Sequence, residues 1–109
     1  SAVESGDLLI VGSPTHGGRP TEAIQNLLGQ LRTTLGAGTR AAAFDTRLAT
    51  RLVAIFGYAA PRIAQTFESA GATLVVPPEG FVVKGKDGPL GEGELERAAD
   101  WARGLVAAP

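Results

Sequence analysis

The 109-residue sequence lacks cysteine and methionine, and it contains only one histidine, one tryptophan and one tyrosine. The absence of cysteine excludes disulfides, thiolate nucleophiles and thiolate metal sites, and it fits a reducing compartment. Any Ser-His-Asp arrangement would have to use His16, the single histidine. The absence of methionine leaves two interpretations open: removal of an initiator before Ser1, or a processed or truncated chain.

A surplus of charge of one sign is also lacking, since 10 Lys and Arg residues face 11 Asp and Glu residues, for a formal net charge of -1. No basic excess indicates nucleic acid or an anionic membrane as a partner. No apolar run approaches the roughly 20 residues of a spanning helix, and the N-terminus shows no signal-peptide pattern. We therefore expect a soluble, cytoplasmic protein that forms one domain over residues 1–109.

Short apolar segments bounded by turn residues predict the strands. They cover residues 8–11, 40–44, 52–56 and 73–76, and an extended segment resumes at 81–83 after an interruption that contains Pro77 and Pro78. A continuous apolar run such as 8–11 is typical of a strand that is covered on both faces. Prolines exclude an unbroken central strand at 77–80, because proline cannot donate to the ladder.

Helical periodicity predicts three helices: one that begins at Pro20 or Thr21 and ends at Gly36, one over 60–70, and one from Glu94 onward. Their expected apolar stripes are Ile24, Leu27, Leu28 and Leu31; Ile63, Phe67 and Ala70; and Leu95, Ala98, Ala99, Ala102, Leu105 and Val106. Alternation of strands and helices predicts an α/β fold with a parallel sheet and right-handed crossovers. Ligands of such sheets bind beyond the carboxyl ends of the strands, so the loop after residue 12 is a candidate site.

The run Gly12-Ser-Pro-Thr-His-Gly-Gly18 resembles the flavodoxin family, in which a similar loop follows the third strand and wraps the flavin ring of FMN. The run Phe56-Gly-Tyr-Ala-Ala60, with the helix and residues 71–75 after it, is similar to the second flavin loop of that family. Residues 78–97 resemble a subgroup of small flavodoxin-like proteins. The resemblance implies a flavodoxin-like open parallel sheet with helices on both faces, aligned from the third strand onward.

The N-terminal strands and the phosphate loop of the family, [ST]-x-[ST]-G-x-[ST], have no counterpart in the sequence. In the family strand order, 2-1-3-4-5, the first strand would lie beside residues 8–11. Without it, that strand has a bare hydrophobic edge. We expect a second copy, in a homo-oligomer, or a missing N-terminal segment to cover this edge.

The resemblance implies that two loops contact the isoalloxazine ring, with Tyr58 on a ring face and His16 at the ring edge. The residues implied for these loops are Ser13, Pro14, Thr15, His16, Gly17 and Gly18 in the first and Gly57 and Tyr58 in the second. Asp45, Thr46 and Arg47 follow the second strand and are further candidates for cofactor binding. An ordinary salt bridge between Asp45 and Arg47 is the alternative, and it would contribute little if exposed.

These features predict FMN-dependent electron transfer of flavodoxin type, either as an electron carrier or as a small FMN-dependent reductase. The partner would be a redox protein or a small-molecule acceptor. The alternative is a flavodoxin-like structural or interaction module that no longer binds flavin, which the missing phosphate loop favours. We do not expect a hydrolase, because Ser13 lacks the G-x-S-x-G surroundings of a nucleophile elbow.

Overall fold

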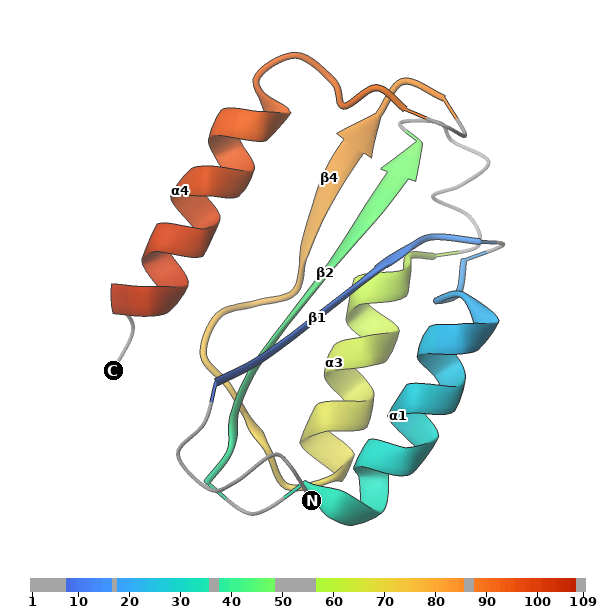
Figure 1. Cartoon of the computed structure of the whole chain (residues 1–109), viewed down its shortest axis with the longest axis vertical. Coiled ribbons are helices and arrows are strands. Elements are labelled where there is room, and N and C mark those ends of the chain that lie inside the picture. The colour runs from blue at the N-terminus through green and yellow to red at the C-terminus, as the bar shows by residue number, and fades with distance from the viewer. Residues whose placement is uncertain (1–7, 17, 36–37, 49–56, 86–87, 108–109) are drawn as a thin grey trace.

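The computed structural model describes residues 8–16, 18–35, 38–48, 57–85 and 88–107. In chain order its elements are β1 (Leu8–Pro14), α1 (Glu22–Thr34), β2 (Arg40–Leu48), α3 (Ala59–Ser69), β3 (Thr73–Leu74), β4 (Glu79–Val83) and α4 (Glu94–Ala107). They form an α/β domain with an open parallel sheet, with α1 and α3 on one face and α4 on the other (Figure 1). The predicted fold class is therefore confirmed. The strand predicted over 52–56 lies outside the described residues.

The sheet has the order β1-β2-β3, and β4 also pairs with β2. Because β1 occupies one edge of β2, strands β3 and β4 lie in line along the other and together form one interrupted strand. The interruption contains Pro77 and Pro78, as predicted. Its limits differ from the prediction, since β3 ends at Leu74 and β4 begins at Glu79.

Strand β2 is longer than the predicted 40–44, and it includes Asp45, Thr46 and Arg47, which were expected in a loop. The added length comes from pairing with β4, whose register runs from Phe44↔Glu79 to Leu48↔Val83. Strand β1 likewise extends through Pro14, which lies opposite Thr46. Local sequence does not show these partners, because they come from distant parts of the chain.

The main core lies between the sheet and the pair α1 and α3. Ala41 and Ala43 of β2 are fully buried in this core, and such small side chains let α3 approach the sheet closely. The buried members of this core are Val11, Leu28, Leu31, Leu35, Ala41, Ala43, Ala60, Ile63, Ala64, Phe67 and Ala72. Helix α1 begins at the predicted cap, where Thr21 Oγ1 accepts the N–H of Ile24. Leu27 of the predicted stripe is exposed.

The opposite face of the sheet carries α4 and an aromatic cluster of Phe44, Phe81 and Trp101. Their rings meet edge to face, with centroids 5.7 to 6.1 Å apart. The stripe predicted for α4 is only partly buried: Leu105 is buried, whereas Leu95 and Val106 are 72% and 83% exposed. Among the described residues, α4 is the only helix on this face of the sheet. Leu95 and Val106, near the two ends of α4, therefore have no further helix to pack against.

Two further features of this face concern the sheet edge. Within the described chain, β1 pairs with no strand except β2, and Ile10 on β1 is 45% exposed.

None of the described helices is long and apolar enough to cross a membrane.

Candidate functional site

The carboxyl ends of β1, β2 and β4 meet at one edge of the sheet, where they surround a hollow of about 110 Å³. Five of the predicted site residues line it: Pro14, Thr15, His16, Thr46 and Arg47. Leu48, Val83 and Gly85 line it too and were not predicted. The sequence could have indicated Val83 and Gly85, because they stand at the end of the last extended segment, and parallel strands bring such ends to the same edge of the sheet.

The loop after β1 is fixed between β2 and α3. The backbone N–H of Thr15 donates to the Thr46 carbonyl at 2.9 Å, and Thr15 Oγ1 accepts the N–H of Ala59 at 3.2 Å. His16 and Arg19 exchange two backbone hydrogen bonds of 2.8 and 3.0 Å, which close the loop, and the His16 side chain is exposed. The loop therefore presents His16 to solvent from a fixed backbone.

Ser13 and Gly18 make hydrogen bonds that stabilise the loop after β1. Ser13 is buried, and its Oγ donates to the Pro14 carbonyl and accepts the N–H of Thr21. Neither of the hydrogen bonds of this hydroxyl involves His16. Gly18 has φ 80, a region that favours glycine, and its carbonyl accepts Arg62 Nε at 2.8 Å. The predicted residue Gly17 lies outside the described residues.

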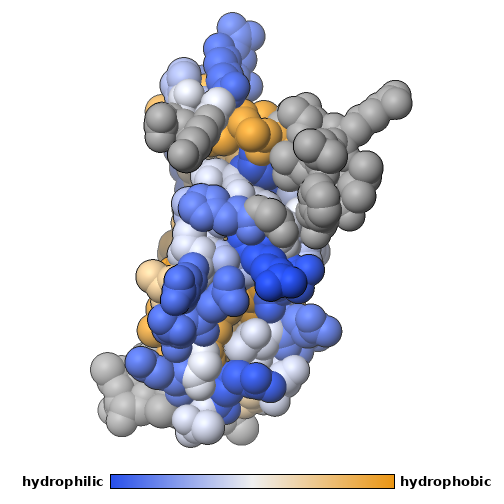
Figure 2. All heavy atoms as spheres, turned by 90° about the vertical axis from the view of Figure 1, so that its right-hand side faces the viewer, coloured by the Kyte–Doolittle hydropathy of each residue, from blue (hydrophilic) through white to orange (hydrophobic). Residues whose placement is uncertain are grey.

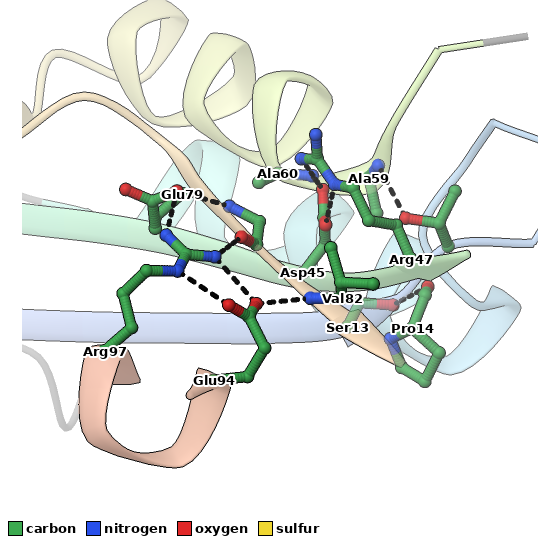
Figure 3. Close-up of polar contacts among 12 residues, drawn as sticks. Ser13, Pro14, Asp45, Arg47, Ala59, Ala60, Glu79, Val82, Glu94 and Arg97 are labelled. Carbon is green, nitrogen blue, oxygen red and sulfur yellow. Dashed lines mark hydrogen bonds and ion pairs between the residues drawn. The ribbon is translucent and has the colours of Figure 1, made fainter. Parts of the chain in front are cut away.

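Asp45 anchors the N-terminus of α3 (Figure 3). Its fully buried carboxylate accepts Arg47 Nε and Nη2 at 2.7 and 2.8 Å, and it accepts the N–H of Ala60 at 2.8 Å. A carboxylate at this end of a helix satisfies a free N–H and suits the helix dipole. The salt bridge considered from the sequence is thus present, with its carboxylate fully buried and its guanidinium partly buried. The Asp45 side chain points to α3.

Arg47 and Tyr58 form a stacked pair beside this anchor. The guanidinium carbon of Arg47 lies 3.5 Å from the centroid of the Tyr58 ring, a distance typical of a cation–π contact. Tyr58 is the N-cap of α3 and follows Gly57, whose φ of 88 favours glycine. A Cβ on Gly80 would overlap the Arg47 guanidinium, so Gly80 leaves room for it. Arg47 covers one face of the Tyr58 ring, and a planar ligand could stack only on the other face.

A second ionic group joins α4 to β4, on the other side of the sheet (Figure 3). Glu94 accepts Arg97 Nε at 2.9 Å and the N–H of Val82 at 2.6 Å, while Arg97 pairs with Glu79 at 2.9 Å. The hydrogen bond from Arg97 and that from Val82 lower the pKa of Glu94 to about 2. This group holds a helix and does not face the hollow at the strand ends.

Among the described residues, no three His, Asp or Glu side chains are grouped so that they could hold a metal ion. The site is therefore built from hydroxyl groups, backbone groups, one imidazole and one guanidinium. Such a set can bind the polar edge of a neutral planar ligand. No protein-family model matches the chain, and no curated protein sequence has significant similarity to it.

Proposed function

We propose that this chain takes part in FMN-dependent electron transfer of flavodoxin type and contacts the isoalloxazine ring at the carboxyl edge of its sheet. One observation carries the proposal: Thr15 and His16 after β1 line the same hollow as Thr46 and Arg47 at the end of β2. Thr15 and His16 belong to a loop that the sequence resemblance assigns to flavin binding, and Thr46 and Arg47 are candidates because of their place near the carboxyl end of a strand. FMN would supply the electron chemistry, and the protein would supply position and surroundings.

The donor set fits one edge of a flavin ring. Hydroxyl and imidazole groups of Thr15, Thr46 and His16 can meet ring carbonyl and nitrogen atoms, while Leu48 and Val83 offer apolar contact to the ring itself. The hollow, at about 110 Å³, is smaller than the roughly 300 Å³ of typical ligand pockets. In this proposal the described residues supply only one wall of the flavin site.

The residues around this hollow and at the N-terminus of α3 do not fit the phosphate of FMN. A phosphate usually binds free N–H groups at a helix N-terminus. At α3 those of Ala59 and Ala60 already donate to Thr15 and to the carboxylate of Asp45, which would also repel a phosphate. We therefore expect riboflavin, which lacks the phosphate, to bind the purified chain about as tightly as FMN.

Flavin fluorescence titrations test the proposal. The full chain should quench both FMN and riboflavin, and Tyr58→Leu should weaken both by about tenfold, since a base–aromatic stack contributes about 1–3 kcal/mol. Arg103→Gln, on the exposed side of α4, is the control and should leave both affinities unchanged. Failure to bind either flavin would rule out the electron-transfer role. A strong preference for FMN would instead mean that a phosphate contact exists.

A second candidate function, an interaction module without flavin, is favoured by an apolar hollow of about 370 Å³ on the α4 face. It is lined by Ile10, Phe44, Phe81, Leu90 and Trp101, together with residues of α4. Surface hollows of this character often bind other proteins. Light scattering would test it: self-association that Ile10→Lys abolishes, together with no flavin binding, would favour this function over electron transfer.

A further inference from the structure

Three arginines surround a third hollow, on the face of the sheet that carries α1 and α3. The hollow has a volume of about 330 Å³, and Arg19, Arg32 and Arg62 all line it. Its lining contains no carboxylate, although Gln25 and Gln65 contribute amide groups. Figure 2 shows this side of the molecule, where hydrophilic side chains predominate. The hollow therefore concentrates positive charge in a protein whose formal net charge is -1.

None of the three arginines forms an ion pair with any residue that the structure describes. Arg47, Arg97 and Arg103, by contrast, each pair with a carboxylate. Like charges around one hollow repel each other unless an anion lies between them. This unbalanced charge is the first indication of an anionic ligand.

One of the three arginine side chains is held by a hydrogen bond to the backbone. Arg62 Nε donates to the Gly18 carbonyl at 2.8 Å, which leaves the terminal nitrogens of its guanidinium free of that bond. Arg19 is held by its two backbone bonds to His16, and Arg32 lies in the last turn of α1. The side chains of all three are exposed, so a ligand can reach them.

Gly29 leaves open space at the hollow. Residues 25, 28, 29 and 32 follow helical spacing along one side of α1, and all four line the hollow. A Cβ on Gly29 would meet no atom within 4 Å, so open space lies in front of this position. A larger side chain at position 29 would enter that space.

We propose that this hollow binds a compact polyanion with phosphate groups, of the size of pyrophosphate or a small phosphorylated metabolite. Guanidinium groups match phosphate oxygens in paired hydrogen bonds, and arginine is favoured where such recognition is needed. The volume lies at the lower end of the range for small-molecule sites. A concave surface with amide groups suits a small ligand better than the flat surface of an acidic protein. The proposal does not depend on flavin binding.

Isothermal titration of the full chain with pyrophosphate tests the proposal. We expect saturable binding with one ligand per chain, which weakens as the salt concentration rises. Arg62→Gln should reduce the affinity about tenfold, and Arg19→Gln and Arg32→Gln should reduce it severalfold, because each removes a charge-assisted hydrogen bond. Arg103→Gln is the matched control, since it removes an exposed arginine outside the hollow, and it should leave the affinity unchanged.

Gly29→Leu separates shape from charge. This variant keeps every arginine and places a good helix former within α1, so the fold should persist. Its side chain should occupy the hollow and weaken pyrophosphate binding at least as much as Arg32→Gln does. Circular dichroism of each variant verifies that the fold is retained.

Three results would overturn the proposal. The first is the absence of saturable pyrophosphate binding at low salt. The second is an equal loss of affinity in Arg103→Gln and Arg62→Gln, which would indicate diffuse attraction to the whole surface. The third is binding of a glutamate-rich peptide that depends on Arg62 while pyrophosphate does not bind, which would assign the face to an acidic protein partner.

Discussion

The carboxylate of Asp45 accepts the backbone N–H of Ala60 at 2.8 Å and joins the middle of β2 to the first turn of α3. The same carboxylate accepts hydrogen bonds from Nε and Nη2 of Arg47, and it is fully buried. Helix α3 thus begins on a charge that a strand supplies, rather than on a side-chain cap of its own. Because Arg47 also stacks on Tyr58, the carboxylate indirectly orients the ring proposed to contact flavin.

Asp45→Ala should lower the free energy of unfolding by about 3–5 kcal/mol, because it leaves a partly buried guanidinium and a buried N–H without their partner. Asp100→Ala is the control: it removes a carboxylate from the pair with Arg103, whose side chains are 76% and 74% exposed. That change should cost less than about 1 kcal/mol. Urea denaturation followed by circular dichroism measures both. Equal losses would mean that the buried carboxylate has no special role.

Gly12→Ala and Gly29→Ala should change stability in opposite directions. A Cβ on Gly12 would overlap the ring of Phe44, which packs against Phe81 and Trp101, so the variant should lose about 1–3 kcal/mol. A Cβ on Gly29 meets open space in an exposed helix, so that variant should gain about 0.4–1 kcal/mol. Thermal unfolding measures both changes. The fluorescence of Trp101, the only tryptophan, should change in Gly12→Ala alone.

The contribution of Glu94 to stability should depend on pH. Its pKa falls from 4.5 to about 2 in the folded protein, so the unfolded state binds this proton more tightly. Glu94 therefore stabilises the fold above about pH 4.5, and this contribution is lost as the pH falls toward 2. Glu94→Gln removes the titrating group.

Unfolding free energies of the wild type and of Glu94→Gln, measured from about pH 7 down to about pH 2.5, test this expectation. The wild type should be the more stable protein at neutral pH, and the difference should shrink as the solution becomes acidic. The fluorescence of Trp101 can follow the unfolding transition at each pH. A difference that stays constant across this range would contradict the coupling of Glu94 to Arg97 and Val82.

Much of the fold could be predicted from local patterns. The three helices lie where periodicity and caps place them, and Thr21, one of the two predicted starts, is the N-cap of α1. Pro77 and Pro78 interrupt the last strand for the predicted reason, the absence of a backbone donor. The candidate loop does follow β1 at its carboxyl end, because strand–loop–helix order determines the edge at which such a loop lies, although Ser13 and Pro14 belong to the strand itself.

Other features could not be predicted, because they depend on partners far away in the chain. The limits of β2 follow from its pairing with β4, and the burial of Asp45 follows from the position of α3. Exposure of Leu95 and Val106 likewise depends on which layers cover α4, not on the helical period.

The sequence by itself determined which segments become strands or helices and where one candidate loop lies, since propensity, periodicity and turn residues act over a few neighbours. Only the tertiary structure decided which groups these side chains contact. It directed Asp45 to the N-terminus of α3, placed Arg47 on Tyr58, and gathered Arg19, Arg32 and Arg62 around one hollow. The physical reason is that hydrogen bonds, ion pairs and concave surfaces require groups that only the packing of sheet and helices brings within reach.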